Sequence, residues 1–521
     1  MSVIDALEHA GIASPDICGK KADLFLQSAR QQGAYEALCS AITLDPAHSV
    51  ALLKRADLLY LYGYLSLAKT DYEAVFRLNN TSIAAIAGLC LVHKARKDFT
   101  QALYFAQTAL AIQPGSKALE DLKYEVLLDA GRIHDILTDC DVKLRANAHL
   151  ANPQVNIDWS IRKARAHALV SNFCEAEAIC NNVLDACSQN TEAARLAQDI
   201  LLAQRRWLEA YRLPYWHGAD IETLCRLPRP STVEDLKNKH VWVIAQQGHG
   251  DMILAARFIA SLESYGARVT LQVPENLIRL MAALLPAHGQ RTILALGAGI
   301  AAADYAMSMS DLQKFLSICH TSIPFHDTPY FSIPNQSKET FSGILERYEP
   351  LDWRQRLKVG IAWFGGVANY DARRSLHLSE FSTLFDCADA IFVNLQIAKE
   401  YSTWGTWHEV TRGHKDGRGG HFVDVTSSIV DFADTAAVIN ELDLVISCDT
   451  AVAHLAGALC KPTWILSRYD CAPFWAELNG KTPWYESAKI YRQTTWGNWA
   501  EVIQRVKADL LSFPNPQPEI G

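Results

Sequence analysis

The sequence predicts a multi-domain fold class, in which an all-α superhelix of repeats precedes an α/β region made of two Rossmann-like lobes. Residues 15 to about 210 read as helix almost throughout and repeat with a fixed period. From about residue 240 onward, short β-branched strands alternate with helices, which is the pattern of parallel α/β sheets. Glycines and polar side chains stand where several of these strands end, and ligands bind at that edge of a parallel sheet.

The helical half repeats every 34 residues. Small residues and the pairs at which helices should end recur at this spacing: Ala34, Ala68 and Ala102; Ala22, Ala56 and Cys90; Asp45-Pro46, Asn79-Asn80 and Gln113-Pro114. The period is typical of tetratricopeptide repeats (TPR), paired helices that stack into a superhelix. The pattern is clear for three repeats and weaker up to residue 210, so we expect about five repeats over residues 1–210.

A repeat array of this kind has two interpretations. It can be a scaffold or dimerisation surface, or its concave groove can hold a stretch of another protein. TPR arrays bind polypeptides far more often than small molecules, so we favour the second interpretation on fold-level analogy.

The α/β half divides into two lobes. A connector over residues 211–239 leads to a first lobe, residues 240–345, with strands expected at 240–245, 268–273 and near 292–296 and helices at 251–264 and 275–285. A second lobe, residues 346–497, opens at "LKVGIAWFG", continues with "AIFVNLQ" and closes with a strand–helix–strand unit at 444–466. An amphipathic helix from Asn498 to Leu511 and a loose tail complete residues 498–521.

The first lobe carries an acidic residue at the turn between its first strand and the following helix. The stretch Gln247-Gly248-His249-Gly250-Asp251 lets the backbone turn sharply and places Asp251 near the free N–H groups of the helix. The third glycine of a dinucleotide fingerprint is missing. Asp251 is therefore either a helix cap or a carboxylate at the cleft that accepts a proton.

The second lobe has a glycine loop followed by two arginines. Trp363 and Gly365-Gly366 follow its first strand, and Arg373 and Arg374 come a few residues later. Such a pair of arginines is usually solvated surface, but it is also suited to binding a phosphate.

The segment "LVISCDTAVAHLAGALCKPTWIL" places polar residues between two apolar strands. Thr450 should begin a helix over 451–459 that Pro462 ends, and the N-terminus of a helix favours anions. Asp449 can orient a hydroxyl or hold the turn. His454 taken alone is more often a core histidine than a ligand contact, but three polar corners fall at strand ends that should face one cleft.

Composition limits the classes of partner and cofactor. The net charge of −8 argues against nucleic acid. The spacing of Cys174, Cys180 and Cys187 fits packing within helices better than metal ligands, so no metal cofactor is expected. The N-terminus does not read as a signal peptide, and the longest apolar run, near residue 293, is broken by Asp304. We expect a cytoplasmic protein without an integral membrane segment.

Five segments carry a resemblance to a known family: "AQQGHGDMILAARF", "VGIAWFGG", "RRSLHL", "LVISCDTAVAHLAGALCKPTWIL" and "PWYESAKIYRQTTWGNW". Together they resemble bacterial TPR-containing protein glycosyltransferases, whose catalytic part is similar to the heptosyltransferases of the two-lobed GT-B fold. The layout is similar to that of flagellin-modifying transferases, in which the repeats recruit the acceptor, and in plan to O-GlcNAc transferases. The resemblance covers the catalytic half nearly end to end and the repeat half in kind.

The resemblance implies site residues. Asp251 matches the acidic residue taken as the catalytic base. The residues that match the nucleotide-sugar site, or stand beside matching ones, are Gly250, Trp363, Gly365, Arg374, Gln396, Asp449, Thr450, Ala451 and His454. The chain departs from the family at Lys399, which is displaced, and in the loop "GVANYDARRS"; both departures concern the identity of the donor.

The sequence thus predicts a metal-independent glycosyltransferase that moves a sugar from a nucleotide sugar to a Ser or Thr of a protein held by the TPR groove, with flagellin as the hypothesis for that protein. Inversion at the anomeric carbon is implied by the family alone. Two alternatives stay open: a transferase acting on lipopolysaccharide or another glycan, and a non-enzymatic TPR adaptor with a degenerate transferase domain. Because the chain is acidic and carries a repeat array, the transferase acting on lipopolysaccharide or another glycan ranks below the protein glycosyltransferase. The presence of Asp251 and of Asp449-Thr450 disfavours the adaptor.

Overall fold

The computed structural model describes residues 14–28, 30–147, 153–213, 227–245, 248–286, 291–299, 302–347, 356–365, 372–386, 390–397, 407, 421–470 and 475–514. The chain separates into two compact units, Met1–Lys143 and Leu144–Gly521. The second unit therefore holds the last helices of the repeat region together with the α/β region. The predicted domain boundaries stay predictions.

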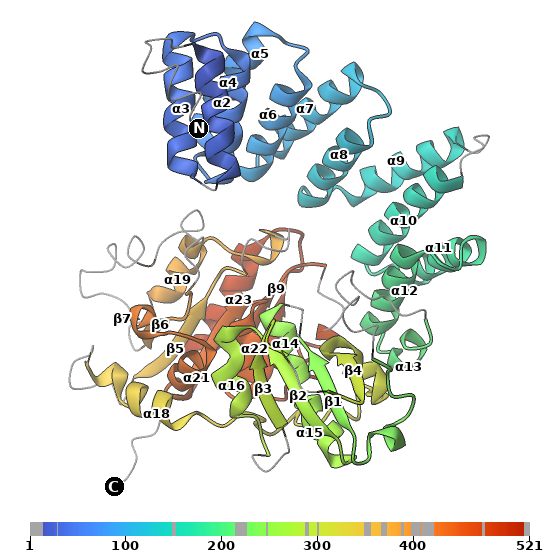
Figure 1. The fold of residues 1–521 in the computed structure, drawn as a ribbon, viewed down its shortest axis with the longest axis vertical. Coiled ribbons are helices and arrows are strands. Elements are labelled where there is room, and N and C mark those ends of the chain that lie inside the picture. Colours follow the sequence, from blue (N-terminus) through green and yellow to red (C-terminus); the bar gives the residue numbers. More distant parts are fainter. Residues whose placement is uncertain are drawn as a thin grey trace. The chain divides into compact units, whose positions relative to one another are not determined.

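The first unit consists of helices, which pack in consecutive pairs up to Ile112 (Figure 1). Their bounds are α2 (Pro15–Gln27), α3 (Gln31–Leu44), α4 (Ser49–Leu61), α5 (Leu65–Leu78), α6 (Ile83–Ala95), α7 (Phe99–Ile112), α8 (Lys117–Asp129) and α9 (Ile133–Ala146), which runs across the unit boundary. The residues that define the predicted period lie at the helix contacts and are 0% exposed: Ala22, Ala34, Ala56, Ala68, Cys90 and Ala102. Helices α3, α5 and α7 end one residue before the predicted boundary pairs, so the period of the sequence is the period of the fold.

The turns inside the helical pairs share a feature of backbone conformation from α4–α5 onward. A residue with positive φ closes the turn in each of these pairs: Gly63 (77°), Lys97 (60°), Gly131 (67°), Ser171 (60°) and Arg205 (59°). The spacing is 34 residues except between Gly131 and Ser171, where it is 40. The repeat therefore continues through residue 210, with extra residues between its fourth and fifth pairs.

Replacing a glycine in one of these turns tests the importance of the left-handed conformation. Gly131→Ala should lower the free energy of unfolding by about 1 kcal/mol or more, because a Cβ disfavours positive φ. Lys97→Ala is the matched control: this exposed position already holds a side chain in the same conformation, so the change should stay within about 0.5 kcal/mol. Urea denaturation of both variants measures the difference. An equal loss in the free energy of unfolding for both variants would contradict a requirement for the left-handed conformation at Gly131.

The last helices of the repeat region belong to the second unit. They are α10 (Pro153–Leu169), α11 (Phe173–Ala186), α12 (Thr191–Ala203) and α13 (Trp207–Ala210). Trp207 is 1% exposed and its ring stacks on Trp484 at 4.9 Å. Arg205 Nη2 donates to the carbonyl oxygen of Ala476 at 2.7 Å. These contacts join α13 to the core of the α/β region.

The first α/β sheet is entirely parallel, with strand order β3-β2-β1-β4. Its strands are β1 (His240–Ile244), β2 (Arg268–Val273), β3 (Arg291–Ala295) and β4 (Tyr305–Ser308). The accompanying helices are α14 (His249–Ala255), α15 (Ile259–Ser264), α16 (Ile278–Ala282), α17 (Leu312–Phe315) and α18 (Asn335–Phe341).

The second sheet is also entirely parallel, with strand order β10-β9-β8-β5-β6-β7. Its strands are β5 (Leu357–Ala362), β6 (Ala390–Asn394), β7 (His421–Asp424), β8 (Leu444–Cys448), β9 (Thr463–Ser467) and β10 (Ala488–Arg492). Helices α19 (Ser382–Phe385), α21 (Phe432–Asn440), α22 (Ala451–Ala458) and α23 (Trp499–Leu511) accompany it. This is the order of a doubly wound nucleotide-binding sheet. The predicted fold class, a TPR array followed by two Rossmann-like lobes, is confirmed.

Several elements differ from their predicted form. The helix expected at 251–264 begins at His249 and is interrupted by a 3₁₀ turn over Ala256–Phe258. The helix expected at 275–285 is shorter, a 3₁₀ turn followed by α16. Strands β4, β7 and β10 were not predicted. Gln247, Gly366 and Lys399 lie outside the described residues.

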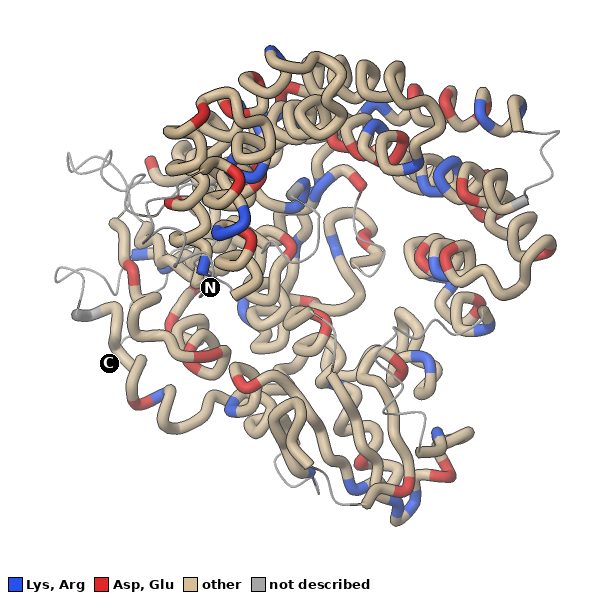
Figure 2. The backbone as a smooth tube through the Cα atoms, turned by 45° about the horizontal axis from the view of Figure 1, so that its top comes forward, with Lys and Arg blue, Asp and Glu red and all other residues tan. Residues whose placement is uncertain are grey.

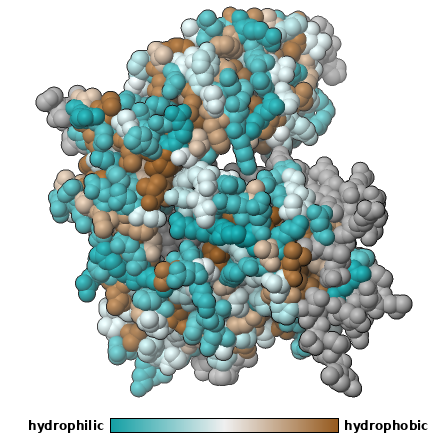
Figure 3. Space-filling view, turned by 180° about the vertical axis from the view of Figure 1, so that it is seen from behind, coloured by the Kyte–Doolittle hydropathy of each residue, from teal (hydrophilic) through white to brown (hydrophobic). Residues whose placement is uncertain are grey.

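Acidic and basic residues are interspersed along the repeat helices that the structure describes (Figure 2). The face seen in Figure 3 likewise mixes hydrophilic and hydrophobic side chains. In the part of the chain that the structure describes, none of the helices combines the length and apolar character needed to cross a bilayer.

Candidate functional site

The strand order defines where the site lies. In each sheet the chain starts at one strand, moves outward, and then returns to the other side of that strand, which creates a switch point between β1 and β4 and between β5 and β8. Parallel sheets bind ligands at this point, beyond the carboxyl ends of the strands. Gly248–Asp251 follows β1, Trp363–Gly365 follows β5, and Asp449-Thr450 follows β8. The predicted corners thus stand at the two switch points.

Helices α14 and α22 bring the two corners together, and they lie side by side (Figure 1). A Cβ placed on Gly250 would lie 2.7 Å from Cδ2 of His454 and 3.5 Å from the Cα of Ala451. Only a glycine allows this approach. The predicted catalytic base, Asp251, is the next residue of α14, and its charge acts on Asp449 of the second sheet.

The Gly250 contact makes a sharp stability prediction. Gly250→Ala should destabilise the protein by about 1–3 kcal/mol, because the buried ring of His454 cannot move away from the new methyl group. Gly248→Ala is the control, since its Cβ would meet only Oδ2 of the Asp251 side chain, at 3.3 Å. Thermal unfolding of both variants measures the effect. A Gly250→Ala protein as stable as Gly248→Ala would contradict the observed helix packing.

Thr450 begins α22 as its N-cap. Its Oγ1 accepts a hydrogen bond from the backbone N–H of Val452 at 3.2 Å and lies 2.9 Å from Oγ of Ser447. The backbone N–H groups of Ala453 and His454 bond to the carbonyl of Thr450, at 3.1 and 3.3 Å. The corner is thus held rigidly, and the positive end of the helix dipole lies at the switch point.

The loop after β5 is fixed from behind by buried groups. Oε1 of Gln396 accepts hydrogen bonds from the N–H groups of Trp363 at 3.1 Å and Phe364 at 2.9 Å. The ring of Trp363 is fully buried in the core of the second sheet. Arg374 Nη2 donates to the carbonyl of Gly365 at 2.8 Å. Gln396 and Trp363 therefore shape this loop, and Arg374 lies across it.

Two carboxylates and Arg374 form the charged centre of the site. Desolvation by the surrounding protein raises the pKa of Asp251, although part of its side chain faces solvent, while the Arg374 charge and the Gly248 N–H oppose the shift. Burial raises the pKa of Asp449 to about 6, opposed by Arg374 and by a hydrogen bond with Trp475, and the Asp251 charge raises it further. Asp251 and Asp449, from different sheets, therefore share one cation and influence each other.

The raised pKa of Asp449 should make stability depend on pH. Because the folded-state value, about 6, exceeds that of an unfolded aspartate, about 3.9, the ionised carboxylate destabilises the fold. The penalty is absent below about pH 4 and complete above about pH 6. Asp449→Asn should thus raise the free energy of unfolding by about 1–3 kcal/mol at pH 7 and hardly at pH 4. Urea denaturation at both pH values measures this, and an equal effect at both would contradict it.

His454 is held in place by two aromatic side chains. It is 2% exposed, its ring stacks on Trp475 at 4.6 Å and 7°, and its Nδ1 lies 3.1 Å from Oη of Tyr485. Burial and the charges of Arg257 and Arg374 lower its pKa to about 3. His454 is therefore neutral at physiological pH.

The structure brings most of the predicted residues to one place. Gly250, Asp251, Gly365, Arg374, Asp449, Thr450, Ala451 and His454 stand at the facing switch points, whereas Trp363 and Gln396 support the loop from within. Their roles towards a ligand stay predictions. Trp475, Tyr485 and Arg257 are not among the site residues predicted from the sequence. A lone arginine inside the apolar stretch "MILAARFIA" was an available signal for Arg257.

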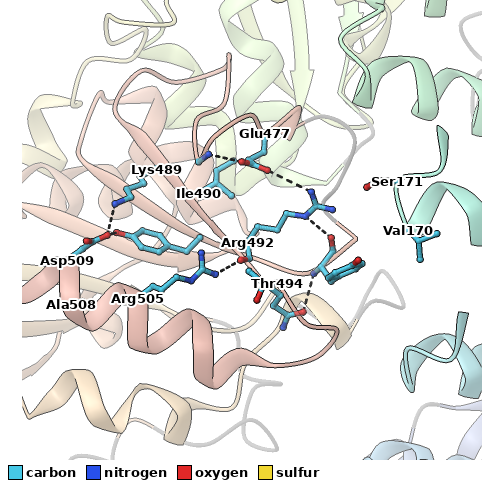
Figure 4. Close-up of a pocket in the computed structure, with 14 residues that line it drawn as sticks. Val170, Ser171, Glu477, Lys489, Ile490, Arg492, Thr494, Arg505, Ala508 and Asp509 are labelled. Atoms are coloured by element: carbon cyan, nitrogen blue, oxygen red, sulfur yellow. Dashed lines mark hydrogen bonds and ion pairs between the residues drawn. The ribbon is translucent and has the colours of Figure 1, made fainter. Parts of the chain in front are cut away.

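Two further observations concern ligands. Among the residues that the structure describes, no group of three or more His, Cys, Asp or Glu side chains is arranged to hold a metal ion. A cavity of about 700 Å³ lies apart from the predicted site residues, between the α10–α11 turn and the edge strand β10 with α23 (Figure 4). Its charged side chains are engaged with neighbours, including Arg492 with the Tyr469 carbonyl and Lys489 with Asp509.

Comparison with known proteins gives distant similarities. No model of a known protein family matches the chain. The chain is 26% identical over 303 residues to protein FlbA of Caulobacter vibrioides, in an alignment that covers 54% of this chain and 48% of FlbA. The chain therefore spans about half the length of this curated relative.

Two solved structures are similar to separate parts of the chain. The ADP-heptose LPS heptosyltransferase II of E. coli aligns with 52% of this chain and 98% of its own, at 12% identity and a TM-score of 0.38. A tetratricopeptide repeat protein from Parabacteroides merdae aligns with 42% of this chain and 81% of its own, at 16% identity and a TM-score of 0.31.

Proposed function

We propose that the protein is a glycosyltransferase that moves a sugar from a nucleotide sugar to a hydroxyl of an acceptor protein held by the repeats. One observation carries the proposal. The switch point of a doubly wound sheet, with Arg374 and the N-terminus of α22, faces a carboxylate, Asp251, at the switch point of a second sheet. Arg374 and the N-terminus of α22 are suited to binding the phosphates of a nucleotide, and the Asp251 carboxylate is suited to accepting the proton of an acceptor hydroxyl.

Asp251 is the general base in this proposal. As the acceptor oxygen attacks the anomeric carbon, the Asp251 carboxylate takes the hydroxyl proton, and the bond from that carbon to the phosphate oxygen breaks. The electron pair leaves with the nucleotide. A raised pKa makes Asp251 a stronger base than an exposed aspartate. This direct displacement inverts the anomeric carbon.

Arg374 and α22 stabilise the leaving group. The guanidinium is anchored to Gly365 and lies near both carboxylates, so its charge is already in place before the reaction. The helix dipole at Thr450 adds a second positive field. Together they supply the charge that the departing phosphate requires, without a metal ion.

In this proposal the repeats recruit the acceptor protein. We take this acceptor to be a flagellin in the cytoplasm. Removing Met1–Lys143 tests this recruitment, because Leu144–Gly521 is a compact unit. A cut at residue 211 would be unsuitable, since it removes Trp207, which packs against Trp484 in the α/β core.

The experiment is co-expression with the flagellin of the source organism, followed by intact-mass spectrometry of that flagellin. We expect the full chain to add the mass of a sugar, and the Leu144–Gly521 protein to lose this activity while it still binds nucleotide. Undiminished modification by Leu144–Gly521 would refute recruitment by the first repeats. Turnover of the donor on a glycan in place of flagellin would favour the lipopolysaccharide alternative.

A further inference from the structure

A chain of hydrogen bonds links His454 to the backbone of α14, beside the first sheet. Nδ1 of His454 lies 3.1 Å from Oη of Tyr485, and this oxygen lies 3.3 Å from Oη of Tyr330. Tyr330 Oη in turn lies 3.1 Å from the carbonyl oxygen of Ile253 in α14. All three side chains are buried.

The last acceptor fixes the direction of every bond in the chain. A carbonyl oxygen only accepts, so the single hydroxyl proton of Tyr330 is donated to Ile253. Tyr485 must then donate its own proton to Tyr330, and the remaining bond needs a proton from Nδ1 of His454. The neutral ring therefore carries its proton on Nδ1, and Nε2 holds the lone pair.

Arg257 favours the same arrangement. It is 0% exposed, its Nη2 donates to Oη of Tyr330 at 3.3 Å, and its guanidinium lies 4.7 Å from the ring centres of both Tyr330 and Tyr485. Its positive charge favours tyrosine oxygens that accept and opposes a proton on His454. Burial, together with the charges of Arg257 and Arg374, lowers the pKa of the ring to about 3.

We infer that Tyr485, held by Tyr330 and Arg257, is a positioning residue that fixes His454 as the Nδ1–H tautomer. Nε2, which lies beside Gly250, then only accepts hydrogen bonds. A ligand group that meets this nitrogen must be a donor, such as a sugar hydroxyl, and cannot be a phosphate oxygen. That the ligand is a nucleotide sugar rests on the proposed function; the tautomer does not.

The test is long-range proton–nitrogen NMR of the full chain with ¹⁵N-labelled histidine, in which the His454 signals are those lost in His454→Gln. We expect the Nδ1–H tautomer, unchanged between pH 5 and pH 8. In Tyr330→Phe the Tyr485 proton loses its acceptor and turns to His454, so the signals should change to those of the Nε2–H tautomer. Tyr485→Phe removes the acceptor of the Nδ1 proton and should move the signals in the same direction.

An Nε2–H tautomer in the wild type, a titration between pH 5 and pH 8, or unchanged signals in Tyr330→Phe would overturn the inference. The same sample is titrated with ADP, GDP, UDP and CMP. Absence of binding by all four would count against the proposed function and would leave the tautomer result standing.

Discussion

Asp251→Asn should lower kcat/KM for sugar transfer by roughly 10²–10⁴-fold, the usual contribution of a general base. The amide keeps the size of the side chain but cannot accept the hydroxyl proton. Nucleotide binding should persist, because the features assigned to the phosphates belong to the second sheet. Steady-state rates and nucleotide affinity, measured on the same preparation, separate the two effects.

The raised pKa of Asp251 adds a second readout. The group must be ionised to act as a base, so kcat/KM should fall as the pH falls through a value above the ordinary aspartate pKa of about 3.9. An Asp251→Asn enzyme that kept more than a tenth of the wild-type rate would assign the base to another group. Asp449, which faces the same Arg374, would be the first to examine.

Arg374→Ala should weaken the binding of a nucleoside diphosphate by about 10- to 100-fold, because a hydrogen bond to a charged group contributes about 1.5–3 kcal/mol. The variant should also move the acid limb of kcat/KM to higher pH. The arginine charge lowers the pKa values of Asp251 and Asp449, so its removal raises both. Calorimetric titration and a pH profile measure the two effects.

Arg373→Ala is the matched control for this variant. Arg373 is the neighbouring residue, but its Nη1 lies 3.3 Å from Oδ2 of Asp470 and its guanidinium lies over Trp496. Its loss should leave nucleotide affinity within about threefold and the acid limb in place, as expected for a residue that does not contact the phosphates. Equal losses of nucleotide affinity in both variants would contradict a specific contact between Arg374 and the phosphates.

Local sequence patterns were sufficient for the elements that carry the site. The β-branched runs on both sides of "AVAHLAGAL" and the position of Pro462 predicted a strand–helix–strand unit at 444–466, and β8, α22 and β9 together span 444–467. The period of 34 residues predicted which small side chains are buried in the repeats. Each of these signals depends on neighbours in the sequence and on the geometry of one element.

The partners of His454 could not be predicted in this way. Its contacts with Gly250 and Tyr485 join segments that are far apart in the sequence, and they depend on how α14 packs against α22. Trp363 and Gln396 stand at strand ends like the other candidates, but their side chains turn into the core to hold the loop. A strand end therefore indicates where a site lies, and tertiary packing decides which side chains face it.

The most direct test of donor binding is thermal unfolding of the full chain in the presence of nucleotides and nucleotide sugars, beside the Asp449→Ala, Thr450→Ala double variant. A ligand at about 100 times its dissociation constant stabilises a protein by roughly 2.7 kcal/mol. We expect one nucleotide class to raise the unfolding temperature of the wild type and to have no effect on the double variant. No shift with any nucleotide or nucleotide sugar would contradict a donor site at the β5–β8 switch point.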